Sequence, residues 1–171
     1  MQTFCTLSPI PKFRNWLEGK LVRYHKGLVN DGPFTQQELY QLEGIFASKT
    51  YLLDLLETTK SPSWHIDRPY LVDKLEPLLM KLAAYYLTIE SHRGGLLCPV
   101  AKFHIRNGAE MYRLNYMGDT SIKGLRTSCG IMINYRYVLD NIEDNSVNYE
   151  MNGKFAVKDG VSCWLNEHDD K

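Results

Sequence analysis

The first half of the chain repeats apolar residues every three to four positions, the spacing typical of amphipathic helices. The first such segment follows Pro11, which suits a first helical turn, and continues from Phe13 to Leu21. Just before it, the short apolar run 4–7 has strand propensity and stops at the Ser-Pro-Ile-Pro sequence 8–11. We therefore expect a strand, a stiff turn and a helix at the amino-terminal side.

Three further helices are expected before residue 100. Thr35 and Glu38 form a capping box, in which each side chain satisfies the other residue's free backbone amide, so a helix is expected to begin there. Another helix is expected around 52–56. The longest one is expected over about 69–91, where Pro77 should kink the helix or divide it in two.

The pattern then changes. Residues 101–106 alternate apolar and polar side chains, which predicts a half-buried strand. Asn107-Gly108 is a strong hairpin signal, so the run 109–116 is expected to pair with that strand. One face of the hairpin would then be polar and would carry Lys102, His104, Arg106, Arg113 and Asn115.

The last third of the chain predicts two more helices. Apolar residues from Ile122 to Leu139 are spaced by threes and fours, and the preceding residues 119–121 offer helix caps. Asn152-Gly153 marks a turn, and a short terminal helix is expected around 157–165. Together these elements predict one α+β domain that is rich in helices, with a β-hairpin and few strands.

Composition fits a globular domain and excludes some classes of function. The 171 residues are 44% hydrophobic and carry a net charge of zero, so the main electrostatic source of nucleic-acid affinity is absent. No apolar run reaches the roughly 20 residues that cross a bilayer. The four scattered cysteines form no C-x-x-C pair and the five histidines no H-x-x-x-H pair, which gives a metal site no support and is typical of a reducing compartment.

The residue pattern alone leaves the chemistry open. Ser8 precedes a proline and is held in an extended conformation, where serines usually bond to the local backbone. His104 on a polar strand face is most often solvated or bonded to a neighbour. Asn115 has the character of a turn residue. These residues indicate no more than a soluble α+β domain with one polar face.

Several long motifs nevertheless resemble a known family. They are Leu7-Ser8-Pro9-Ile10-Pro11 with Phe13 and Trp16-Leu17, His92-Arg93-Gly94, Pro99-Val100-Ala101 with Phe103-His104 and Asn107-Gly108-Ala109, the run from Arg113 to Gly124, and Asn134-Tyr135-Arg136-Tyr137. In this order and at this spacing, over about residues 7–149, the chain resembles the carboxy-terminal region of malonyl-CoA decarboxylases.

The resemblance implies a partial acetyltransferase-like (GNAT) fold that converts malonyl-CoA into acetyl-CoA and carbon dioxide in fatty acid metabolism, with no cofactor or metal. It also implies that Ser8 and His104 are the catalytic pair. Histidine titrates near neutral pH and can protonate the carbon that loses carbon dioxide, while the serine orients the ring or relays the proton. We therefore expect the fold to bring these two side chains within hydrogen-bond reach, directly or through one water. Asn115 and Tyr135 are expected to line the substrate pocket.

The resemblance further implies that residues 1–171 are a single catalytic domain, truncated on its amino-terminal side. Family members carry an upstream helical domain and a Gly-rich loop that holds the CoA pyrophosphate, so the isolated chain is expected to have little or no decarboxylase activity. Two alternatives stay open: an inactive family member that acts as an interaction or regulatory module, and a CoA-thioester acyltransferase. The compartment (mitochondria, peroxisomes or cytosol) and homo-oligomerisation through the helical domain also stay open.

Overall fold

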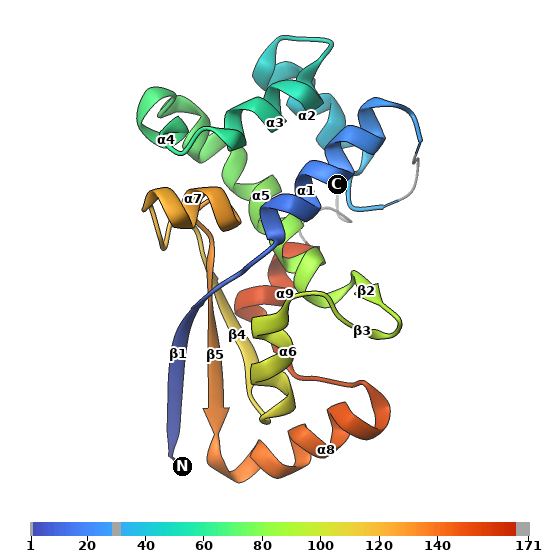
Figure 1. Cartoon of the computed structure of the whole chain (residues 1–171), viewed down its shortest axis with the longest axis vertical. Helices are drawn as coiled ribbons and strands as arrows, with labels where there is room; N and C mark the ends of the chain where they lie inside the picture. Colours follow the sequence, from blue (N-terminus) through green and yellow to red (C-terminus); the bar gives the residue numbers. More distant parts are fainter. Residues whose placement is uncertain (1, 29–31, 167–171) are drawn as a thin grey trace.

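A computed structural model describes residues 2–28 and 32–166 (Figure 1). The elements are β1 (Thr3–Pro9), α1 (Phe13–His25), α2 (Gln36–Phe46), α3 (Tyr51–Lys60), α4 (Trp64–Asp67), α5 (Tyr70–Thr88), β2 (Ser91–His92), β3 (Gly95–Leu96), α6 (Pro99–Arg106), β4 (Glu110–Asn115), α7 (Ile122–Ser128), β5 (Met132–Val138), the 3₁₀ turn η1 (Leu139–Asn141), α8 (Ile142–Asn152), β6 (Val157–Lys158) and α9 (Asp159–Asn166). The expected α+β class is confirmed. No helix among the described residues is both long and apolar enough to cross a membrane.

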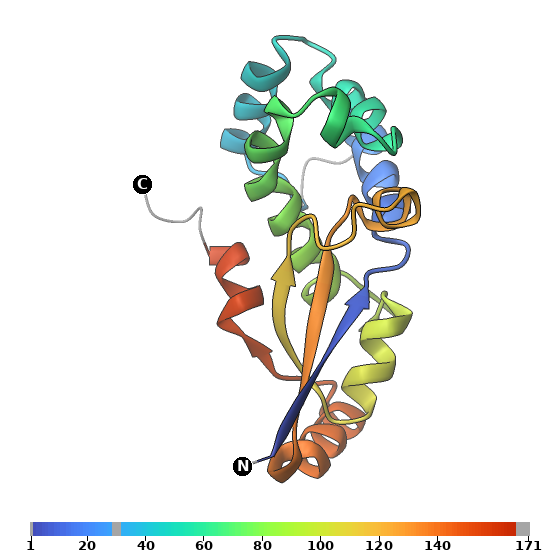
Figure 2. The ribbon, with the colours of Figure 1, turned by 90° about the vertical axis from the view of Figure 1, so that its left-hand side faces the viewer.

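The molecule has a helical end and an end that contains the sheet with helices α6, α8 and α9 around it (Figure 1 and Figure 2). Helices α1 to α4 and the start of α5 gather at one end, and the sheet forms the other (Figure 1). The strand order is β1-β5-β4-β6, with β1 and β4 antiparallel to β5 and β6 parallel to β4. Helices α6 and α9 cover opposite faces of this sheet (Figure 2). The second half of α5 packs against the sheet end, so one apolar core joins the two parts.

The amino-terminal elements follow the sequence prediction closely. β1 runs through Ser8 to Pro9, two residues further than expected, and α1 begins at Phe13. The capping box is present, with Thr35 Oγ1 accepting from the Glu38 amide and the Glu38 carboxylate accepting from the Thr35 amide. The same carboxylate accepts from Lys81 Nζ at 2.6 Å, and both side chains are buried. Pro77 lies inside α5, which continues past it as one helix.

The hairpin expected around Asn107-Gly108 is wrong. Residues 99–106 form helix α6, because Pro99 starts the helix, Cys98 Sγ caps it, and Ala101 and Ile105 bury one helical face. Gly108, with φ of 80°, ends it in the left-handed conformation that glycine adopts easily. A six-residue run with alternating polarity fits a short amphipathic helix as well as a strand, and packing against the sheet decides between them.

The helix expected from Ile122 to Leu139 is also wrong. Helix α7 ends at Ser128, where Cys129 and Gly130 both take positive φ values, and residues 132–138 form the central strand β5. Ile133 and Tyr135 alternate with less buried residues along β5, the period of a strand. The chain then makes α8, for which the sequence analysis had no prediction, while the turn at Gly153 and the terminal helix α9 are confirmed.

Candidate functional site

Ser8 is presented by the edge strand of the sheet, close to the Ser-Pro-Ile-Pro turn. The register of β1 on β5 pairs Phe4 with Tyr137, Thr6 with Tyr135, and Ser8 with Ile133. Because alternate residues of a strand point to the same face, these side chains line one side of the sheet. That side is the one covered by α6. Ser8 is 7% exposed, and Thr6 Oγ1 lies 3.1 Å from its hydroxyl.

His104 comes from the last turn of α6, whose position is fixed at its carboxy-terminal end. Ser146 Oγ and Asn145 Nδ2, both in α8, donate to the carbonyl oxygens of Arg106 and Gly108 at 2.8 and 3.1 Å. The missing side chain of Gly108 lets the backbone at Ile142 approach closely. Helix α8 therefore holds the end of α6 against the sheet.

The fold brings the two predicted catalytic residues together although they lie 96 positions apart in the sequence. Ser8 Oγ lies 3.3 Å from His104 Nε2, a long hydrogen bond. The other ring nitrogen, Nδ1, is 2.7 Å from the hydroxyl of Tyr137. The imidazole also stacks on the ring of Tyr135, with centroids 4.3 Å apart. Both nitrogens and one face of the His104 ring therefore have a contact that favours this orientation.

Burial sets the protonation states of this group. Partial desolvation lowers the pKa of His104 below its ordinary value and raises the pKa of Tyr137, so burial favours the neutral form of both side chains. Burial also holds the pKa of Tyr135 well above its usual range. A neutral histidine bonded to two hydroxyl groups can exchange a proton at Nε2 while its orientation is kept at Nδ1.

The two residues expected to bind substrate lie in different surroundings. Tyr135 is fully buried and contacts His104 through its ring; its hydroxyl has no hydrogen-bond partner among the described residues. Asn115 pairs with Met132 across the sheet, so it lies on the face opposite His104. Its amide donates to Asn134 Oδ1 at 2.8 Å, and Asn134 in turn donates to the Thr6 carbonyl. The structure therefore brings Tyr135 to the pair but not Asn115.

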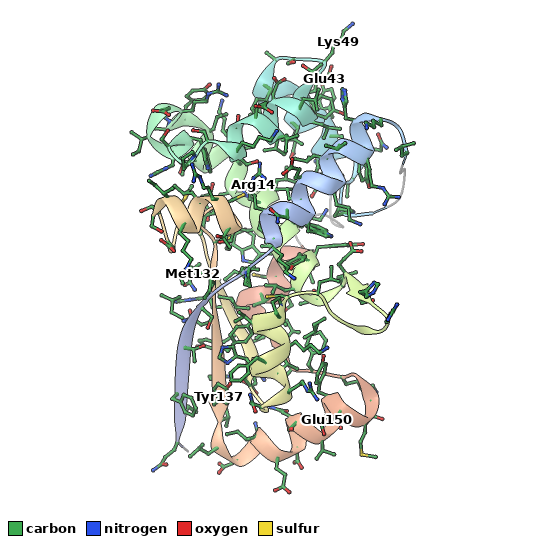
Figure 3. All side chains as sticks on the ribbon, viewed as in Figure 1. Arg14, Glu43, Lys49, Met132, Tyr137 and Glu150 are labelled. Carbon is green, nitrogen blue, oxygen red and sulfur yellow. The ribbon has the colours of Figure 1, made fainter. Side chains whose placement is uncertain are left out.

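Tyr137 is the site residue that sequence reasoning missed (Figure 3). A helix over 122–139 would have pointed Tyr135 and Tyr137 in nearly opposite directions, whereas a strand puts them on one face. The available signal was the alternation of Ile133, Tyr135 and Tyr137 with the polar residues at 134 and 136. No group of three or more metal-ligating side chains occurs in the part of the chain that the structure describes.

Comparison with known proteins shows which family the chain belongs to. The family model of the malonyl-CoA decarboxylase C-terminal domain matches residues 1–171. The chain belongs to this family. Malonyl-CoA decarboxylase of Anser anser anser is 42% identical over 149 residues, and that of Mus musculus is 40% identical over 146 residues. The alignments cover 87% and 85% of this chain, but only 29% of each relative.

Solved malonyl-CoA decarboxylase structures share the fold. The protein from Rhodopseudomonas palustris superposes with a TM-score of 0.72 at 33% identity, covering 95% of this chain and 33% of that one. The protein from Agrobacterium vitis gives a TM-score of 0.74 at 30% identity, covering 98% of this chain and 36% of that one. This malonyl-CoA decarboxylase domain thus spans about a third of the length of its solved relatives.

Proposed function

We propose that this domain carries the catalytic pair of a malonyl-CoA decarboxylase, which converts malonyl-CoA into acetyl-CoA and carbon dioxide. The observation that carries the proposal is the contact between Ser8 Oγ and His104 Nε2 at 3.3 Å. The contact joins two family motifs that are distant in the sequence, and a buried tyrosine hydroxyl holds the ring from behind. The family indicates malonyl-CoA as the substrate, and the contacts of His104 provide groups suited to proton transfer.

The reaction replaces a carboxylate by a proton. The bond between the carboxylate carbon and C2 of the malonyl group breaks, carbon dioxide leaves, and the electron pair spreads over C2 and the thioester oxygen. The protonated ring of His104 then gives its Nε2 proton to C2, directly or through the Ser8 hydroxyl, and solvent restores the proton to the ring. General acid catalysis of this kind contributes about 10²–10⁴-fold.

The lowered pKa of His104 fits this role when substrate charge is included. Burial disfavours the imidazolium in the free protein. A bound malonyl carboxylate would place a negative charge near the ring, and an opposite charge favours the protonated form. The substrate would therefore recruit the proton that it later consumes, and the Tyr137 oxygen would accept from Nδ1–H of the charged ring.

Two finer expectations have unequal support. The antiparallel set β1-β5-β4, flanked by α6 and α9, supports the proposal of a partial acetyltransferase-like (GNAT) fold. Substrate contacts by Asn115 and Tyr135 have less support, because Asn115 lies on the far face and Tyr135 is fully buried. The proposed role of Tyr135 is to support the imidazole ring.

The test measures acetyl-CoA formed from malonyl-CoA. It uses this chain alone, for which little activity is expected, and a chimera in which the chain replaces the matching 33% of the Rhodopseudomonas palustris protein. Ser8→Ala and His104→Ala in the chimera should each lower kcat by about 10²-fold or more while the circular dichroism spectrum is kept. Full activity in either variant would remove that residue from the mechanism.

A further inference from the structure

The outer face of α6 forms the floor of a groove. One hollow of about 520 Å³ lies between α6, the β2–β3 hairpin and the end of α8, and its lining includes Arg93, Lys102, Arg106 and Glu150. A second hollow of about 400 Å³ adds Phe103 and Asn107 and shares Lys102 and Arg106 with the first. We call this continuous depression the α6 groove.

The α6 groove is basic although the whole chain is neutral. It holds three cationic side chains and one carboxylate, that of Glu150, which lies 3.9 Å from Arg106 in a loose pair with both side chains more than half exposed. Within the residues that the structure describes, neither Arg93 nor Lys102 forms an ion pair. Guanidinium and ammonium groups gathered in one hollow are suited to phosphate.

An aromatic side chain adds a second kind of contact at the rim. Phe103 lines the second hollow and is 62% exposed, so its ring is accessible to a ligand in the groove. Purine rings stack on exposed aromatic rings of this kind. Cations together with an exposed ring therefore favour a phosphorylated nucleoside over inorganic phosphate or an acidic peptide.

The α6 groove is also connected to the catalytic pair. The rings of Phe103 and His104 are edge-to-face with centroids 5.2 Å apart, while Lys102 lies about 200° further round the helix from His104. A helix with its side chains is about 10–12 Å wide, and the pantetheine arm of CoA is longer than this. A thioester placed at His104 could run past Phe103 and reach the cations.

We propose that the α6 groove binds the 3′-phosphoadenosine end of the CoA substrate, with Lys102, Arg106 and Arg93 on its 3′-phosphate and Phe103 against adenine. This inference rests on the proposed function for the choice of CoA. The groove would then hold the substrate at its nucleotide end and leave the thioester at Ser8 and His104.

The test titrates the 171-residue chain with adenosine 3′,5′-bisphosphate, which has the nucleotide end of CoA but no thioester, by isothermal titration calorimetry. The Lys102→Gln/Arg106→Gln double variant should raise Kd by about tenfold or more, because hydrogen bonds to charged groups are lost. Phe103→Ala should also raise Kd, and higher salt should weaken wild-type binding. Lys49→Gln, an exposed charge at the opposite end of the molecule (Figure 3), is the matched control and should stay within about twofold.

The outcomes separate this inference from the proposed function. If the double variant binds the nucleotide more weakly than wild type, nucleotide binding in the α6 groove is supported, even if the chimera with the Rhodopseudomonas palustris protein forms no acetyl-CoA. Absence of saturable binding, or equal Kd values for the double variant and wild type, would overturn the proposal that the α6 groove binds the nucleotide, even if the chimera were fully active.

Discussion

Gly108 lies at the end of α6 and contacts α8, and its replacement by alanine should be costly for two separable reasons. Its φ of 80° is strained for any residue with a Cβ, at about 1–2 kcal/mol. An added Cβ would also overlap the Ile142 carbonyl and lie 2.8 Å from Ile142 Cα, so the start of α8 must move. Overpacking of this kind costs about 1–3 kcal/mol. The free energy of unfolding should therefore fall by about 2–5 kcal/mol in Gly108→Ala.

Gly153→Ala is the matched control. Gly153 also follows a helix, with φ of 65°, but an added Cβ there meets nothing within 4 Å. Its replacement should cost the conformational strain alone, about 1–2 kcal/mol. Urea unfolding followed by tryptophan fluorescence gives both values. Losses that agree within about 0.5 kcal/mol would show that α8 does not approach Gly108 as closely as the structure has it.

Three further predictions concern the site and the helical end. Tyr137→Phe removes the hydroxyl that is 2.7 Å from His104 Nδ1. It should lower the free energy of unfolding in urea by about 0.5–1.5 kcal/mol and should lower kcat of the chimera. An unchanged kcat would show that the hydroxyl does not contribute to the reaction. Because burial lowers the pKa of His104, its NMR titration midpoint should lie below the ordinary value of about 6.5, and a midpoint at or above that value would contradict the burial. The unfolded chain then binds the proton more readily, so this group's contribution to stability is full above about pH 6.5 and is lost as pH falls through the folded pKa. Lys81→Met removes the cation 2.6 Å from the buried Glu38 carboxylate and should lower the free energy of unfolding by about 3–5 kcal/mol. Lys60→Met breaks an exposed ion pair and should lower it by at most about 1 kcal/mol. Similar losses in the two denaturant titrations would contradict the expected effect of burial.

The elements that the sequence predicted well are those whose signals are local. The capping box at Thr35 and Glu38 needs only four consecutive residues, and the long apolar repeat of α5 needs only the helix itself. The strand 4–7 was bounded by prolines and lies within β1. In each case, backbone preference and side-chain pattern agree with the final packing.

The elements that were missed depend on contacts distant in the sequence. The strand β5 pairs with β1 and β4, and neither partner is adjacent to it in the chain. Together with Ile122 and Leu125, its apolar residues also fit the three-to-four-residue spacing of a helix, so the sequence pattern predicted a helix in place of a strand. Helix α6 is short, and the sheet face that buries Ala101 and Ile105 distinguishes it from a strand.

The candidate pair could be named without the correct local structure. Family motifs pointed to Ser8 and His104, although His104 was expected on a strand and lies on a helix. Tyr137 needed the strand assignment, because only β5 places its hydroxyl on the same face as Ser8. The candidate residues Ser8 and His104 could therefore be predicted from motifs, whereas the contact of Tyr137 with the imidazole could be found only from the fold.

A double-mutant cycle on kcat tests most directly whether Ser8 and His104 act as one unit in proton transfer. Acetyl-CoA formation would be measured in the chimera for Ser8→Ala, His104→Gln and the double variant. Residues that share one proton path should be strongly non-additive, so the double variant should lose about as much activity as His104→Gln alone. Losses that multiply would mean that the two side chains act independently and would contradict the proposed pair.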